Sequence, residues 1–246
     1  MTRSWMQSSG RDVIRSVTDY LLGLNGLALL EKLVRCAEDE TDDECASMAL
    51  QLLRSSLISM RSEPVTLHLI ENASAVQTCS GILSKSTSPP VIEAVGSLLA
   101  LLCVSVEGRE IALTIAVIET ILSKTADMLQ LEEDGAIVAL MGALMAITVD
   151  DKAKQHVYDA GVDIFVDTLD ASLARESASK VILNTLQCIS NMAEHPLARA
   201  TFRERGIDSA LQRVLSQATE EGKTMLATTA ERTMTICKFV HLPRLP

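Results

Sequence analysis

Residues 179–215, SKVILNTLQCISNMAEHPLARATFRERGIDSALQRVL, contain the pattern from which the fold can be predicted. Within residues 181–193, apolar side chains recur at three- and four-residue intervals, which predicts the buried face of a long helix. His195 and Pro196 should end that helix and begin a short one, because proline is tolerated in a first helical turn. Gly206 then permits the left-handed residue that closes the short helix. A further helix follows it.

The same pattern recurs upstream in steps of about 45 residues. One step back, Gly206 falls on Gly161 and Ile189 falls on Leu144, so each position keeps its character. Leu144 and Ile189 should therefore occupy one buried position in successive units. Asn72, which tolerates a positive φ, marks an earlier joint. The predicted joints lie near residues 26, 72, 116, 161 and 206. A helical unit repeated at this length is typical of an α-solenoid.

Two segments resemble armadillo repeats: residues 191–215, NMAEHPLARATFRERGIDSALQRVL, and residues 147–169, ITVDDKAKQHVYDAGVDIFVDTL. In that family the first helix of a unit is short and carries a basic residue ahead of a glycine. The second helix opens with Gly-Ile, and the third helix is long. The resemblance covers roughly residues 20–240 and implies an all-α fold, a right-handed α-solenoid of about five armadillo-like repeats. HEAT repeats are the nearest alternative.

The resemblance also implies how the chain is divided. We expect residues 1–246 to form a single solenoid domain. Residues 1–25 should supply an N-terminal helix or cap, residues 26–240 the repeats, and residues 241–246 an irregular tail. Terminal units that are more polar than the middle ones are expected where a solenoid stops.

Charge and hydropathy argue against two classes of partner. The formal net charge is −10, and no basic stripe interrupts it, so nucleic-acid binding is not expected. Membrane insertion is not expected either, because the apolar stretch 91–106 contains Glu93 and is better explained as a buried helix. Residues 1–17 faintly resemble an organelle transit peptide. An ordinary amphipathic helix is the favoured interpretation, which predicts a cytoplasmic protein rather than mitochondrial import.

The residues that carry catalysis or bind metals are scattered along the chain. The six cysteines lack a CxxC spacing and are interpreted as small buried side chains in a reducing compartment. The four histidines form no HExxH pair, and the sequence has no P-loop and no GxSxG motif. We therefore expect no catalytic residue, no cofactor and no metal site, and hence no enzyme.

The family indicates where a binding surface should lie, because armadillo third helices line a concave groove. In importin alpha and beta-catenin, Trp and Asn residues on those helices hold an extended peptide. Here Gln187 stands at the Trp position and Trp5 lies outside the repeats, so this ladder is absent. A groove of small and apolar residues would suit a packed helix or a neighbouring subunit. The alternative is that these positions are only solvent-exposed or are covered by the next unit. The predicted protein-binding positions are Ser97, Leu101, Gly142, Ala146, Gln187 and Asn191.

Together these features predict a non-enzymatic protein–protein interaction scaffold or adaptor, a structural subunit of a larger assembly. Residues 230–244, AERTMTICKFVHLPR, resemble the last helix of armadillo proteins from ciliary axonemes and radial spokes, which implies a place in the cytoskeleton of a cilium. An armadillo-type nucleotide exchange factor that clasps Hsp70 is the main alternative. An accessory subunit of an organellar complex and an enzyme are the others.

Overall fold

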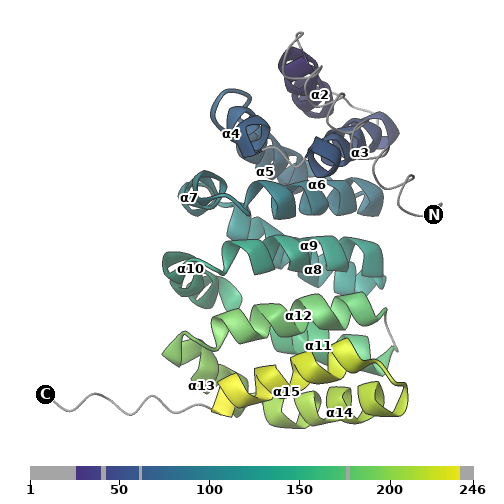
Figure 1. The fold of residues 1–246 in the computed structure, drawn as a ribbon, viewed down its shortest axis with the longest axis vertical. Helices are drawn as coiled ribbons and strands as arrows, with labels where there is room; N and C mark the ends of the chain where they lie inside the picture. The colour runs from purple at the N-terminus through teal and green to yellow at the C-terminus, as the bar shows by residue number, and fades with distance from the viewer. Residues whose placement is uncertain (1–25, 40–42, 61–62, 176–177, 239–246) are drawn as a thin grey trace, which may run out of the picture.

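The computed structural model describes residues 26–39, 43–60, 63–175 and 178–238, which form fourteen α-helices and no strand (Figure 1). The predicted N-terminal cap and the irregular tail lie outside these ranges. In chain order, the helices are α2 (Gly26–Asp39), α3 (Asp43–Met60), α4 (Glu63–Glu71), α5 (Ala75–Lys85), α6 (Pro89–Leu102), α7 (Val106–Thr114), α8 (Val117–Leu131), α9 (Asp134–Ile147), α10 (Asp151–Gly161), α11 (Ile164–Ala174), α12 (Ser179–Met192), α13 (Pro196–Glu204), α14 (Ile207–Glu220) and α15 (Thr224–Lys238).

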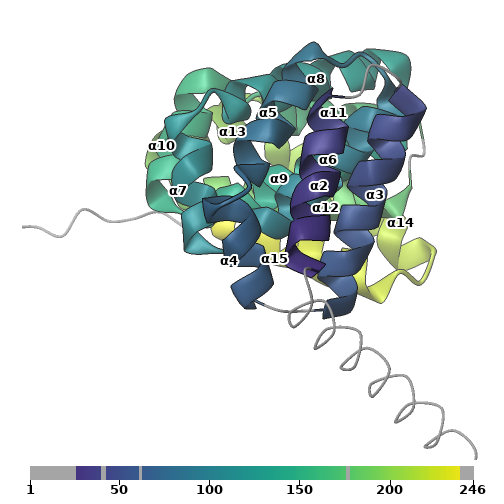
Figure 2. The ribbon, with the colours of Figure 1, turned by 90° about the horizontal axis from the view of Figure 1, so that it is seen from above.

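The helices recur in the predicted period. The third helices of the units, α6, α9, α12 and α15, begin at residues 89, 134, 179 and 224. The short first helices, α7, α10 and α13, begin at residues 106, 151 and 196. Figures 1 and 2 show the third helices stacked in one layer, with the first helices along one edge and the second helices α8, α11 and α14 behind. The chain is therefore an α-solenoid, which confirms the helical repeat predicted from the sequence.

The joints between first and second helices show which turn residues matter. Gly161 and Gly206 have φ values of 139° and 72°, which side chains with a Cβ rarely adopt. The earlier joint lies between α4 and α5, near residue 72, but its left-handed residue is Ser74, with φ of 52°, and not Asn72. Asn72 instead lies directly after α4, and its backbone N–H donates to the carbonyl of His68.

The core is a continuous layer of aliphatic side chains shared between neighbouring units. Leu99, Leu144 and Ile189 stand at the same position of α6, α9 and α12, and all three are fully buried. Their burial confirms the register predicted from the sequence. No helix in the described ranges is both long and apolar enough to span a membrane.

Candidate functional site

The six predicted binding residues lie on three neighbouring third helices. Each helix contributes two of them, one turn apart: Ser97 and Leu101 on α6, Gly142 and Ala146 on α9, and Gln187 and Asn191 on α12. The three helices run side by side in Figure 1. Because a 45-residue step relates them, the six positions form two rows across the layer. Five of them are half-buried, and Gly142 is buried.

Gly142 is not the open surface position that we expected. A Cβ there would lie 3.6 Å from the Asn184 amide nitrogen and 3.7 Å from the Ala100 Cβ. Side chains from α12 and α6 therefore approach each other across this glycine. A large residue at Gly142 would have to displace both neighbours, so an arginine there would test packing rather than binding.

The asparagine amides of α12 are used within the fold. The Asn191 side chain donates to the Met145 carbonyl at 3.2 Å and to the Thr148 hydroxyl at 3.1 Å. Asn184 donates to the Val138 carbonyl at 3.0 Å. The Met145 carbonyl belongs to the last turn of α9, where no backbone N–H is left within the helix to bond it. These amides tie α12 to α9, so they are not free to hold an extended peptide.

Two exposed valines, in the turns that follow α6 and α9, were missed by the sequence prediction. Val104 and Val149 are 69% and 61% exposed, and they lie one turn beyond Leu101 and Ala146. We call Leu101, Val104, Met145, Ala146 and Val149 the third-helix strip. Residues 94–106 and 135–149 contain no charged side chain, and the first charged residues after them are Glu107 and Asp150. The signal was present in the sequence as an apolar residue directly before each helix-capping position.

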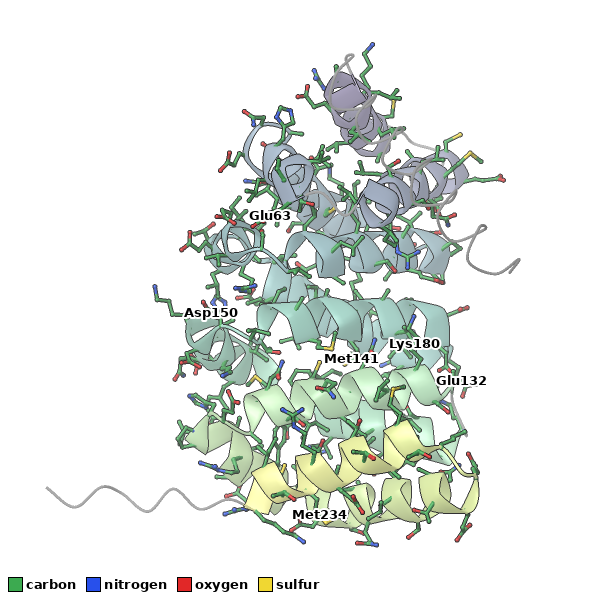
Figure 3. The ribbon with its side chains drawn as sticks, in the orientation of Figure 1. Glu63, Glu132, Met141, Asp150, Lys180 and Met234 are labelled. Carbon is green, nitrogen blue, oxygen red and sulfur yellow. The ribbon has the colours of Figure 1, made fainter. Side chains whose placement is uncertain are left out.

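A repeated cap fixes the end of the strip. Ser105 and Asp150 accept hydrogen bonds from the backbone N–H groups that open α7 and α10, at 3.0 Å from Gly108 and 2.8 Å from Lys152. In Figure 3, Asp150 lies at the joint between α9 and α10. His195 accepts from the Ala198 N–H at the equivalent joint. These caps satisfy donors that a helix start leaves unpaired.

An ion-pair cluster borders the strip at α12. The buried Lys154 ammonium donates to the Asp151 carboxylate at 2.8 Å and to the Glu194 carboxylate at the end of α12. Burial, the largest single effect, lowers the pKa of Lys154, but the two carboxylates together outweigh it and raise this pKa above its usual value. Glu194 stands where the two units before have Val104 and Val149, so the apolar strip ends here.

Acid should weaken the fold through carboxylates of this kind. The hydrogen bond from Lys154 lowers the pKa of Asp151, and the one from His68 lowers the pKa of Glu31. The unfolded chain then binds more protons near these pKa values, so this stabilisation is present above about pH 4.5 and is lost as the pH falls. We expect the melting temperature to decrease between about pH 5 and pH 3, and Asp151→Asn to make the decrease shallower. A decrease of the same slope in Asp151→Asn and Glu204→Gln, an exposed control on α13, would contradict this.

The cysteines divide into two groups. Cys79, Cys103, Cys188 and Cys237 are buried as predicted, whereas Cys36 and Cys45 are exposed, so the prediction of six buried cysteines is wrong for two. Burial raises the pKa of the Cys103 thiol to about 12, with a smaller opposite effect of Arg109. Such thiols are poor nucleophiles near neutral pH because the thiolate is the reactive form. Cys36 and Cys45 lie on the outer sides of α2 and α3, where the helical period turns them to solvent.

Histidine and carboxylate side chains pair across helices but do not gather into larger groups. His68 contacts Glu31 at 2.7 Å, and His156 contacts Glu119 at 2.7 Å. In the part of the chain that the structure describes, no three His, Cys, Asp or Glu residues are placed to hold a metal ion.

Comparison with known proteins gives the fold and not a family. No protein-family model matches the chain, and no curated protein matches it in sequence. Solved structures do match. One is the crystal structure of an engineered protein, Northeast Structural Genomics Consortium target OR329, with a TM-score of 0.72 and 20% identity over 97% of this chain and 92% of that chain.

The chain shares its fold with engineered proteins. A second one, target OR497 of the same consortium, has a TM-score of 0.68 and 19% identity over 97% of this chain and 56% of that chain. At these identities the similarity concerns the fold alone. The third-helix strip is therefore interpreted from its own residues.

Proposed function

We propose that the chain is a non-enzymatic scaffold that binds a partner protein along the third-helix strip, as a subunit of a larger assembly. The observation that carries this proposal is the exposure of Val104 and Val149, which belong to two segments, 94–106 and 135–149, that contain no charged residue. Exposed apolar side chains that adjoin one another are typical of protein-binding surfaces. On α3, the third helix of an earlier unit, Met48 and Leu52 are also exposed.

A helix is the partner element that suits this strip best. Backbone hydrogen bonding to an extended peptide would need free amide donors, and the Asn184 and Asn191 amides already donate to α9. An amphipathic helix needs only apolar contacts, which it presents at intervals of three and four residues. Leu101, Met145 and Val149 could pack against such a row.

The finer assignments belong to this proposal and rest on the sequence. They are a right-handed solenoid of about five armadillo repeats, a cytoplasmic protein, and an assembly of the ciliary cytoskeleton such as an axoneme or radial spoke. Their support is the resemblance of residues 147–169 and 191–215 to armadillo repeats, and that of residues 230–244 to axonemal members.

Charge placed on the strip should abolish assembly without unfolding the chain. We expect Val149→Glu and Val104→Glu to reduce recovery of the native complex by about tenfold or more, because each would bury an unpaired carboxylate against the partner. Both positions are exposed, so the melting temperature should change little. The measurement is quantitative co-purification of the tagged chain from its native source, with Leu131→Glu on α8 as the matched control.

Three outcomes of this experiment decide between the alternatives. A complex of fixed stoichiometry that both strip variants lose supports the scaffold. Capture of Hsp70 that ATP reverses would instead indicate a nucleotide exchange factor. If both strip variants assemble normally, the contact lies on the opposite face, in the acidic run 38–44, or at an end of the solenoid.

A further inference from the structure

A basic residue recurs at one position of the first helices. Arg109, Lys154 and Arg199 lie 45 residues apart on α7, α10 and α13. Arg109 donates to the Cys103 and Val104 carbonyls at 3.1 and 2.7 Å. Lys154 donates to Asp151 and to Glu194. Arg109 is bonded only by carbonyls, and its buried Nε has no hydrogen-bond partner. Lys154 has two carboxylate partners, one of them from the end of the next third helix.

Arg199 is buried in the same way but lacks such partners. It is only 7% exposed, and among the described residues its guanidinium forms neither a hydrogen bond nor an ion pair. The sequence explains why. Pro196 stands at the position equivalent to Asp151 and offers no carboxylate, while the position equivalent to Glu194 lies outside the described residues. Arg199 is thus a largely buried cation without an ion-pair partner among the described residues, and removing such a charge from water without an ion pair is costly.

A second arginine lies one turn along α13. The Arg203 guanidinium donates through Nε and Nη2 to the Cys237 carbonyl, at 3.1 and 2.7 Å, in the last turn of α15. Burial, and after it the Asp208 carboxylate, raise the pKa of the Cys237 thiol to about 11, although Arg203 and Arg199 both act to lower it. Both guanidiniums therefore lie close to the end of α15. In Figure 1 this is the corner where α13 and α15 meet.

We propose that Arg199 is a carboxylate-binding site, completed by an Asp or Glu side chain of a partner protein that packs on the α13–α15 end of the solenoid. The partner carboxylate would take the place that Glu194 takes on Lys154. This site is distinct from the third-helix strip, and the proposal stands or falls independently of it. Its occupant is a carboxylate rather than a phosphoryl group, because Arg203 is already engaged by a carbonyl. One free guanidinium balances one negative charge, whereas a phosphoryl group brings up to two.

The first test compares two matched variants of the isolated chain by thermal unfolding. Methionine keeps most of the length and apolar volume of either side chain but removes the charge. Arg199→Met should raise the melting temperature by about 2 °C or more, because it removes an uncompensated buried charge. Lys154→Met should give no rise, since that charge is paired with Asp151 and Glu194. If Arg199→Met lowers the melting temperature as much as Lys154→Met does, the proposal is overturned.

The second test supplies the ligand chemistry directly. Sodium acetate should raise the melting temperature of the parent chain above its value in sodium chloride of the same ionic strength, and Arg199→Met should lose this excess. If acetate raises the melting temperature of the parent chain and of Arg199→Met by the same amount relative to chloride, Arg199 is not the carboxylate-binding site. An Arg199-dependent rise with inorganic phosphate and none with acetate would assign it to a phosphoryl group and overturn the carboxylate.

The third test measures whether the chain binds a peptide that carries a carboxylate at the end of a helix. The probe is a peptide of residues 179–195, which comprises α12 and Glu194. In the fold, Glu194 forms an ion pair with Lys154. We expect this peptide to bind the full chain at least about tenfold more tightly than its Glu194→Gln form, as for a charged hydrogen-bonded contact. Arg199→Met should abolish the difference. If the two peptides bind the parent chain equally, or neither binds, the assignment to a partner helix is wrong.

Discussion

Replacing Leu144 with alanine should lower the free energy of unfolding by about 2–5 kcal/mol. Its side chain is fully buried in α9, in the core that neighbouring units share, so the truncation leaves a cavity that a stacked solenoid cannot easily close. Ile189→Ala should have an effect of the same size, because Ile189 is fully buried at the equivalent position of α12. Urea unfolding followed by circular dichroism measures both effects.

The matched control for these variants is Leu197→Ala. Leu197 is 53% exposed on α13, so its truncation should change the free energy of unfolding by only about 0.5 kcal/mol or less. Parent-like stability of both Leu144→Ala and Ile189→Ala would mean that the 45-residue register does not describe the core.

The sequence was sufficient for features that one unit specifies by itself. The 3.6-residue period of α12 identified Ile189 as buried, and a step of 45 residues carried that conclusion to Leu144. Gly161 and Gly206 were predicted as joints because few other residues adopt their φ values. Ser74 was missed, since serine carries no comparable preference for the left-handed region and Asn72 stood nearby.

Features that depend on two units together could not be predicted in this way. The burial of Gly142 depends on Ala100 and Asn184, which belong to the helices on either side. The amide of Asn191 is engaged because the end of α9 lies within 3.2 Å of it. Periodicity within one helix indicates which face is apolar. The distance between two packed helices, however, depends on the side chains of both helices. The sequence placed the candidate binding surface on the third helices, but it did not single out the exposed Val104 and Val149.

Gly96 shows the same limit of the repeat pattern most clearly. Its equivalents one and two units later are Met141 and Leu186, so the sequence alone suggests that a large apolar residue would be tolerated at Gly96. Figure 3 places Met141 on the side of α9 that faces α12, where the fold has room for it. Between α6 and α9 the helices approach more closely. A Cβ on Gly96 would lie 3.0 Å from both the Ala139 carbonyl carbon and the Leu140 backbone nitrogen.

Gly96→Leu should therefore cost about 3 kcal/mol or more of unfolding free energy, because backbone atoms of α9 cannot move aside as a flexible side chain can. The matched control is Gly81→Leu on α5, where a Cβ meets nothing within 4 Å. That change should leave stability equal or slightly higher, since leucine is a better helix former than glycine. Urea unfolding of the two variants beside the parent measures the difference. If Gly96→Leu matches Gly81→Leu, then α6 and α9 can separate freely, and the close contact between them does not contribute to the stability of the solenoid.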